Sequence, residues 1–233
     1  MEMAPGAGPS WWDVRGEWAE PPNERRNGTS GVQRVVDPQS GATYFVKRQV
    51  NHLYRSLRHP SGRPTLLREW RNLQRCAKLG VPTAVPLFFD MRVGAAGWEA
   101  VLVTQALEGY ASLEQGLREG RWSAPRRQQI LLKVAEAIAP LHLAGRKHGH
   151  LYPKEIFVRD GASVAVAFLD WEVARWVGLP RWAGQSDLAR LWRSLAELGV
   201  GDDDRRAFFS HYRSLTGLSN LRLRGVAAEP AAA

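Results

Sequence analysis

The sequence changes character along its length, from alternating segments to segments with a helical repeat. TYFVKRQV, at 43–50, alternates as a strand does and follows the β-rich run VQRVV, at 32–36, across the turn DPQSG. PTLLREWRNLQRCAKLG, at 64–80, repeats its apolar residues at helical spacing, and Gly80 is a typical helix stop. These patterns predict a β-hairpin followed by one helix in the first part of the chain.

The rest of the chain contains two more strand segments and then mostly helices. The strand segments run from Pro86 to Asp90 and from Glu99 to Gln105, and a long amphipathic helix begins after Ser123. A short apolar strand and two helices follow, at 163–171, 186–199 and 203–217. This order predicts an α+β fold, with a small sheet-rich lobe that carries one helix and a larger helical lobe. We predict four parts: a loose N-terminal segment, the two lobes and a disordered tail, at 1–17, 18–106, 107–225 and 226–233.

Composition indicates a compartment and a class of partner. No apolar stretch is long enough to span a membrane, the N-terminus lacks a secretory pattern, and the single cysteine, Cys76, fits a reducing compartment, most simply the cytoplasm. The net charge is +9, and the stretch 47–78 carries nine Lys and Arg residues against one acid, Glu69. Such a stretch favours an anionic partner, either a phospholipid or lipopolysaccharide headgroup, a nucleic acid or a phosphorylated sugar, unless it is only a solvated basic face.

The segment KHGHLYPKEIFV, at 147–158, has the spacing of a kinase catalytic loop, in which His, a variable residue and Asp precede a short turn and a strand. In this chain the position of that Asp is occupied by His150. Phosphoryl transfer from ATP also needs a cation on the phosphates, an acid that orients it, and carboxylate or amide ligands for Mg²⁺. A cation followed by an acid occurs here as Lys47, at the end of an alternating strand, and Glu69, on the next helix. The signal is weak, because any strand Lys followed by a helix Glu would match it.

Asp170 closes the apolar run VAVAFLD, and an acid at the end of a buried strand is costly unless it is paired or bound to a metal. Two glycines before the first strand, Gly28 and Gly31, could offer backbone N–H groups to phosphate, although such a string is usually a turn. Asp187 has the character of a structural acid at a helix start. His148 and His150 could also be a metal pair, but no Cys or acidic cluster accompanies them.

Four long strings resemble the lipopolysaccharide kinase family, the InaA/WaaP/Kdo-kinase group, and its InaA branch in particular: EPPNERRNGTSGVQR, YFVKRQVNHLYRSLRHPSGRPT, HGHLYPKEIFV and FLDWEVAR. The resemblance runs from about Trp18 to about Leu215. It implies a two-lobed, protein-kinase-like fold in the cytoplasm of a Gram-negative bacterium. Related members phosphorylate Kdo or heptose sugars of the lipopolysaccharide inner core at the inner face of the inner membrane.

The resemblance also implies roles for particular residues. Lys47 would bind the ATP phosphates and Glu69 would pair with it, Asp170 would hold Mg²⁺, and the hinge, with Gln105 and Leu107, would meet the adenine ring. The basic stretch 48–75 would face the phosphates of lipid A, the inner core or the inner-membrane surface.

Two departures from the family's pattern leave the activity open. His150 replaces the catalytic Asp, and Glu155 replaces the Asn that is the second metal ligand; glutamate can ligate Mg²⁺, and a neutral His can accept a proton. The first hypothesis is an ATP-dependent sugar kinase. The second is a pseudokinase that binds nucleotide or an anionic glycolipid in the envelope stress response. The third, a nucleic-acid-binding module, has only the basic stretch in its favour, because no recognition motif accompanies the charge.

Overall fold

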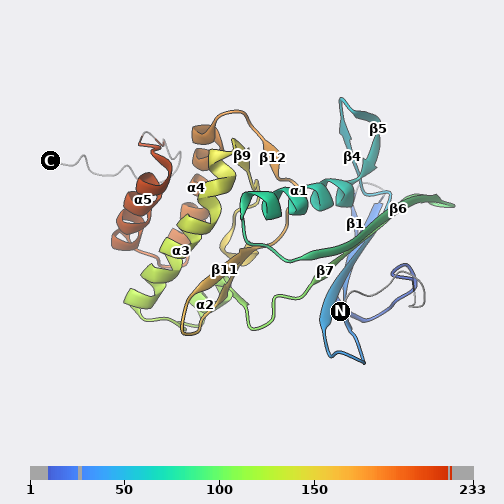
Figure 1. The fold of residues 1–233 in the computed structure, drawn as a ribbon, viewed down its shortest axis with the longest axis horizontal. Helices are drawn as coiled ribbons and strands as arrows, with labels where there is room; N and C mark the ends of the chain where they lie inside the picture. The colour runs from blue at the N-terminus through green and yellow to red at the C-terminus, as the bar shows by residue number, and fades with distance from the viewer. Residues whose placement is uncertain (1–9, 26–27, 220, 222–233) are drawn as a thin grey trace. The chain divides into compact units, whose positions relative to one another are not determined.

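The computed structural model, shown in Figure 1, describes residues 10–25, 28–219 and 221. The chain divides into two compact units, the first made of 1–71 and 84–106 and the second of 72–83 and 107–233. Helix α1 (Thr65–Leu79) therefore contributes its first half to one unit and its second half to the other. Within the described residues no helix is both long enough and apolar enough to cross a membrane.

The first unit is built on a five-stranded antiparallel sheet in the order β1-β2-β3-β7-β6. The strands are β1 (Glu17–Arg25), β2 (Gly28–Val36), β3 (Thr43–Val50), β6 (Pro86–Gly94) and β7 (Gly97–Gln105). All four strand segments predicted in this half of the chain are confirmed. A second hairpin, of β4 (Leu53–Ser56) and β5 (His59–Pro64), was not predicted, because its residues are dominated by charge and turn formers.

Strand β1 was also not predicted, because EWAEPPNER contains two consecutive prolines. Proline lacks the N–H that a central strand needs, so it is tolerated at a sheet edge and at bulges. Both conditions hold here: β1 pairs only with β2 in this sheet, and its register shifts twice between Trp18 and Asn23.

The prediction of a loose segment at 1–17 is wrong for its described part, because residues from 10 onward pack on the sheet. Trp11 and Trp12 lie against the small core formed by Val46, Val101 and Val103. The Trp12 indole N–H donates to Asp90 Oδ2 at 2.9 Å. The tail at 226–233, like residues 1–9, lies outside the described residues.

Helix α1 begins on the sheet because the Gln49 side chain of β3 and the carbonyl of His52 anchor its first turn. The buried Gln49 accepts through Oε1 from the Thr65 hydroxyl at 2.9 Å and from the Leu66 N–H at 3.2 Å, and the Thr65 N–H donates to the His52 carbonyl at 3.0 Å. These bonds satisfy donors that a helix start leaves free. Gly80, in the left-handed conformation with φ of 69°, follows the helix as predicted.

The second unit is mostly helical. Its helices are α2 (Leu113–Arg118), α3 (Ala124–Leu143), α4 (Pro180–Glu197) and α5 (Asp202–Thr216), with a short 3₁₀ turn, η1 (Pro153–Glu155). Two small sheets accompany them, β11-β10-β8 and β12-β9. Their strands are β8 (Ala111–Ser112), β9 (Arg146–Lys147), β10 (Ile156–Arg159), β11 (Ala165–Phe168) and β12 (Arg175–Trp176). Helices α3 and α5 lie side by side (Figure 1), and the buried face of α3 contains the predicted apolar residues Ile130, Val134, Ile138 and Leu141.

The helix predicted at 186–199 in fact begins six residues earlier, at Pro180. Pro180 suits a first helical position, whereas glycine, which stands at position 184, has poor helix propensity. The structure explains that glycine, because a Cβ at Gly184 would lie 2.6 Å from the Tyr212 hydroxyl. The small residue lets α4 approach α5, and close packing outweighs the poor helix propensity.

Candidate active site

In the first unit, Lys47 and Glu69 form the predicted pair. The Lys47 ammonium lies 2.9 Å from Glu69 Oε2, and both side chains are largely buried. Lys47 points to the α1 side of the sheet, since β3 alternates and its neighbour Gln49 also bonds to α1. The structure thus confirms the contact, and the role of Lys47 toward ATP stays a prediction.

The candidate phosphate-binding glycines, Gly28 and Gly31, lie inside β2 rather than in a free loop. A Cβ at Gly28 would lie 2.6 Å from the backbone of Asn51, and one at Gly31 would lie 2.9 Å from the ring of Trp18. Close packing of neighbouring strands is therefore a sufficient reason for both glycines. The contact of these glycines with phosphate stays a prediction. The contact of Gln105, at the end of β7, and of Leu107 with adenine also stays a prediction.

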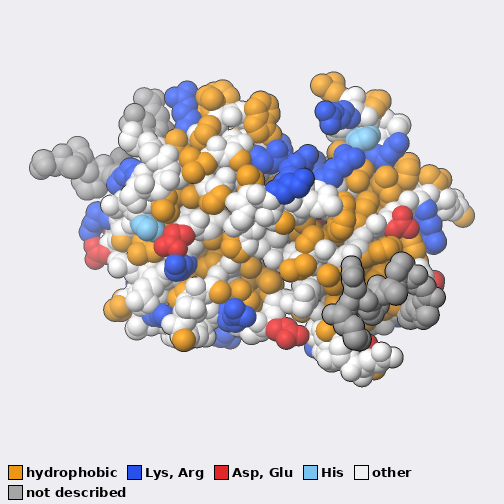
Figure 2. Space-filling model, viewed as in Figure 1, with side chains coloured by type: hydrophobic (Ala, Val, Ile, Leu, Met, Phe, Trp, Pro, Cys, Tyr) orange, Lys and Arg blue, Asp and Glu red, His pale blue; other side chains and the backbone are white. Residues whose placement is uncertain are grey.

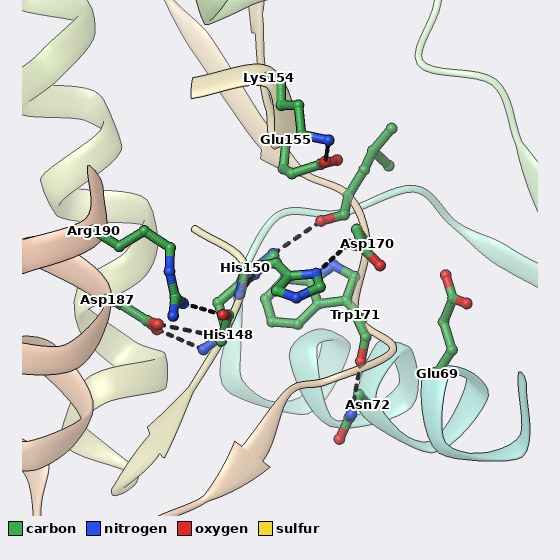
Figure 3. Close-up of polar contacts among 12 residues, drawn as sticks. Glu69, Asn72, His148, His150, Lys154, Glu155, Asp170, Trp171, Asp187 and Arg190 are labelled. Carbon is green, nitrogen blue, oxygen red and sulfur yellow. Dashed lines mark hydrogen bonds and ion pairs between the residues drawn. The ribbon is translucent and has the colours of Figure 1, made fainter. Parts of the chain in front are cut away.

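In the second unit, the segment 147–151 is held by the buried carboxylate of Asp187 (Figure 3). Asp187 Oδ2 accepts the His148 backbone N–H at 2.6 Å, and Oδ1 accepts the Gly149 backbone N–H at 2.9 Å. Burial acts to raise the pKa of Asp187, but the hydrogen bond and charge of His142, with His148 and the Gly149 N–H, outweigh it, so this pKa lies below its ordinary value. Asp187 is therefore structural, but the predicted position at a helix start is wrong, because α4 begins seven residues earlier, at Pro180.

A buried network extends this support from α4 to α5. His142 Nε2 lies 3.3 Å from Asp187 Oδ2, and its Nδ1 lies 2.8 Å from the Tyr212 hydroxyl. The network is satisfied when Nε2–H donates to Asp187 and the Tyr212 hydroxyl donates to Nδ1. Neither His142 nor Tyr212 was identified from the sequence, where each counts as one more residue on an apolar helix face.

His148 is held as a neutral ring. Its Nε2 lies 2.9 Å from the Leu169 carbonyl oxygen and therefore donates, while its Nδ1 accepts the backbone N–H of His150 at 3.2 Å. Burial lowers the pKa of His148, against the opposing effect of Asp187 and Asp170. With both ring nitrogens used in protein hydrogen bonds, an H-x-H metal pair is not formed.

The neutral His148 predicts a specific loss of stability in mild acid. Because its pKa in the folded protein is below the unfolded value of about 6.5, the unfolded chain binds more protons, and stability falls as pH drops below about 6.5. The replacement His148→Asn removes this titration, so only the wild type should lose stability through it. The amount by which the free energy of unfolding of wild type exceeds that of the variant should therefore fall by about 1 kcal/mol from pH 7.5 to 5.5. Urea unfolding at both pH values measures it, with His211→Asn at a partly exposed site as control; an unchanged gap would refute the assignment.

His150 and Asp170 contact each other directly (Figure 3). His150 Nδ1 lies 2.7 Å from Asp170 Oδ2, and the His150 side chain is 45% exposed. Asp170 has a φ of 61°, in the left-handed region that Asp tolerates better than most side chains and that is frequent at functional sites. The residue in the position of the catalytic Asp is thus hydrogen-bonded to the proposed metal ligand.

Glu155 stands at the same end of the β10-β11 pair as Asp170. Its carbonyl accepts the Leu169 N–H at 2.9 Å, and its carboxylate pairs with Lys154 at 3.1 Å. Among the described residues no three His, Cys, Asp or Glu side chains form a group that could hold a metal alone. Mg²⁺ at phosphate sites is usually bound by one or two carboxylates together with phosphate oxygens, so Asp170 and Glu155 fit this ion.

The segment after Asp170 is fixed by residues that sequence analysis missed. The Asn72 side-chain amide donates to the Trp171 carbonyl at 2.9 Å and to the Ala174 carbonyl at 2.8 Å. The buried Trp171 indole donates to the Thr83 hydroxyl at 2.8 Å. A buried amide in a basic helix and a threonine in a loop carry no sequence signal that connects them to a segment about a hundred residues away.

The basic stretch 48–75 is not one continuous surface. Arg48 points to the other face of the sheet from Lys47, where it donates to Gln33 Oε1 at 2.7 Å and to the Trp11 carbonyl at 2.9 Å. Arg63 and Arg68 stack over aromatic rings, and Figure 2 shows further Lys and Arg side chains along α1 and on the β4-β5 hairpin. The exposed cations Arg55 and Arg58 flank Leu57, which is fully exposed at the hairpin tip.

Comparison with known proteins identifies the family. The model of the lipopolysaccharide kinase (Kdo/WaaP) family matches residues 9–212. This chain belongs to that family. Protein InaA of Escherichia coli (strain K12) is 36% identical over 168 residues, which cover 71% of this chain and 77% of that protein. The resemblance inferred from the sequence strings is confirmed.

A solved structure, WaaP in complex with acyl carrier protein, shares the fold. The match has a TM-score of 0.65 and covers 88% of this chain and 80% of that chain, at 22% identity. This confirms the predicted α+β fold, an antiparallel sheet with one helix followed by a mostly helical part, in the family's kinase-like architecture.

Proposed function

We propose that this family member is an ATP-dependent kinase that phosphorylates a sugar of the lipopolysaccharide inner core, Kdo or heptose, or a related glycolipid. The observation that carries the proposal is the placement of Asp170 and Glu155 at one end of the β10-β11 pair, with His150 hydrogen-bonded to Asp170. Such a pair of carboxylates suits Mg²⁺ and ATP phosphates. By itself, the Lys47–Glu69 pair has the composition of the charged pair that kinases use toward ATP phosphates.

Each residue has a role that its own geometry supports. Lys47, held by Glu69, would neutralise phosphate charge. Asp170 and Glu155 would hold Mg²⁺, which would supply positive charge against the charge that develops on the phosphates. In the tautomer whose Nδ1–H donates to Asp170, the bond orients the His150 ring and Nε2 carries a lone pair. Nε2 is then able to accept the proton of the acceptor hydroxyl, in the way that a carboxylate-oriented histidine serves as a base.

The role of His150 predicts a selective loss of transfer. We expect His150→Ala to lower the rate of phosphoryl transfer by about 100-fold or more, because a positioned base contributes about 10²- to 10⁴-fold. Mg²⁺-dependent ATP binding should remain, since His150 does not bind phosphate in this account. His150→Asp, which restores the usual kinase residue, should retain more activity than His150→Ala; equal rates for wild type and His150→Ala would remove His150 from the chemistry.

The second candidate function is a pseudokinase that binds nucleotide or an anionic glycolipid in envelope stress without transfer, and the His at position 150 favours it. Purified chain incubated with γ-labelled ATP, Mg²⁺ and lipopolysaccharide inner-core glycolipids separates the two. Label transfer to a Kdo or heptose sugar supports the kinase. ATP binding without transfer to any acceptor, with transfer appearing in His150→Asp, supports the pseudokinase.

We also propose that the chain works in the cytoplasm at the inner face of the inner membrane, where such an acceptor would be met. The β4-β5 hairpin supports this, because its tip presents Leu57 between two exposed arginines, Arg55 and Arg58.

A further inference from the structure

A second exposed apolar surface lies in the second unit, away from the basic stretch in sequence. It consists of four side chains from the end of α3, from β12 and from the start of α4, and we call it the tryptophan surface: Leu143, Trp176, Leu179 and Trp182. Trp176 is 65% exposed and Trp182 is 53% exposed. Indole rings are usually well covered in folded proteins, so two exposed rings with two leucines are informative.

The local fold presents these side chains together. Val177 N–H donates to the Gly145 carbonyl at 2.8 Å, and a Cβ at Gly145, whose φ is 64°, would lie 2.5 Å from the Gly178 carbonyl and 3.2 Å from Trp176 Nε1. The two glycine backbones therefore touch, which sets the Trp176 ring beside the end of α3. Leu179 and Trp182 come next in the chain, and the Trp182 backbone N–H donates a hydrogen bond to the Leu179 carbonyl at 3.0 Å.

The tryptophan surface is surrounded by positive charge. Arg175 and Arg181, both exposed, immediately precede Trp176 and Trp182. Arg146 stands opposite Trp176 in the β9-β12 pair, Lys147 follows it, and neither 137–154 nor 173–186 contains an acid. Figure 2 shows hydrophobic side chains over the segment that joins β12 to α4.

Two of these cations are held against each other. Arg175 stands directly opposite Lys147 in the β9-β12 pair, an arrangement that is unfavourable for like charges. The pKa of Lys147 is lowered by burial and then by Arg175, against the opposing effect of the buried Asp187, while its ammonium donates to the Ser186 hydroxyl at 3.1 Å. These two side chains lie on the other face of the pair from Trp176, and a negatively charged group that reaches the exposed Arg175 would relieve the repulsion.

We propose that the tryptophan surface docks this chain on an anionic phospholipid bilayer. Trp and Leu side chains with flanking Arg and Lys are what a peripheral protein presents to the headgroup region, where indole rings settle and cations meet lipid phosphates. The core of a protein–protein interface is depleted of charge, whereas an exposed arginine immediately precedes each of these tryptophans. The inference rests on the proposed function in one respect: a glycolipid acceptor would bring the chain to a membrane.

Flotation of the full chain with lipid vesicles, without nucleotide, tests the proposal. Wild type should bind vesicles of phosphatidylcholine with phosphatidylglycerol much more strongly than vesicles of phosphatidylcholine alone. Trp176→Ser/Trp182→Ser should lower binding at least about tenfold, through loss of apolar insertion. Arg175→Gln/Arg181→Gln should lower binding to the anionic vesicles by about 10- to 30-fold, at about 1 kcal/mol for each cation.

Matched controls make the result specific. Leu215→Ser and Arg206→Gln change an exposed leucine and an exposed arginine of α5 and should bind as wild type does. Binding that is unchanged in Trp176→Ser/Trp182→Ser, or that is lost only in the hairpin variant Leu57→Ser/Arg58→Gln, would overturn the proposal, as would absence of vesicle binding in wild type. Because no nucleotide is present, a failure of ATP binding would refute the kinase assignment while leaving a positive vesicle result intact.

Discussion

Replacing Asp187 by alanine is expected to lower the free energy of unfolding by about 4 kcal/mol. The carboxylate is fully buried and accepts the backbone N–H groups of His148 and Gly149 and the side chain of His142. Each donor left without a partner inside the protein costs about 1–3 kcal/mol. Chemical denaturation of wild type and variant measures the difference.

Two further variants control this prediction. Asp187→Asn keeps the size of the side chain but sets an NH₂ group against one donor, so its loss of stability should be intermediate. Asp203→Ala removes an exposed acid of α5 and should change stability by no more than about 0.5 kcal/mol. A loss below about 1 kcal/mol in Asp187→Ala would mean that Asp187 does not support the loop.

The replacement Asp170→Asn is expected to reduce phosphoryl transfer to the background rate, because an amide is a much weaker ligand for Mg²⁺ than a carboxylate. Asparagine is the informative choice, since it also tolerates the left-handed backbone at this position. Asp170→Ala should abolish Mg²⁺-dependent nucleotide affinity too, but it adds about 1–2 kcal/mol of backbone strain. Transfer of label from ATP and the melting temperature are measured together.

Because Asn and Asp side chains have nearly the same size, Asp170→Asn allows a folding defect to be distinguished from a loss of chemistry. Its melting temperature should stay close to that of wild type, whereas its rate should fall. Asp160→Asn, at an exposed carboxylate paired with Arg126, is the matched control and should leave the rate unchanged. Transfer by Asp170→Asn at the wild-type rate would mean that Asp170 is not the metal ligand.

The sequence predicted those parts of the fold whose pattern is local. Strands β3 and β7, the helices α1, α3 and α5, and the stop at Gly80 follow from alternation, helical spacing and a glycine at the helix end. Strand β1 and the start of α4 could not be predicted in this way. Two prolines are acceptable in β1 only because it is an edge strand, and Gly184 is acceptable in α4 only because Tyr212 approaches it.

The candidate site likewise has residues that the sequence identified and residues that it did not. Lys47, Glu69, His150 and Asp170 were identified from residue type and order, and the structure brings them together in the pairs Lys47–Glu69 and His150–Asp170. The supporting residues, such as His142 and Asn72, were not found, because their partners are distant in sequence. Asn72 acts through bonds to backbone carbonyls, which any sequence supplies, and His142 acts through the side chains of Asp187 and Tyr212 on other helices.

Calorimetric titration of ATP into the purified chain, with and without Mg²⁺, tests the central claim most directly. If Asp170 and Glu155 hold Mg²⁺ together with bound ATP, ATP should bind with Mg²⁺ and bind much more weakly without it. The Mg²⁺-dependent part should disappear in Asp170→Asn and persist in Asp160→Asn. Failure of ATP to bind, or binding of equal strength with and without Mg²⁺, would contradict the assignment of a working kinase site to this chain.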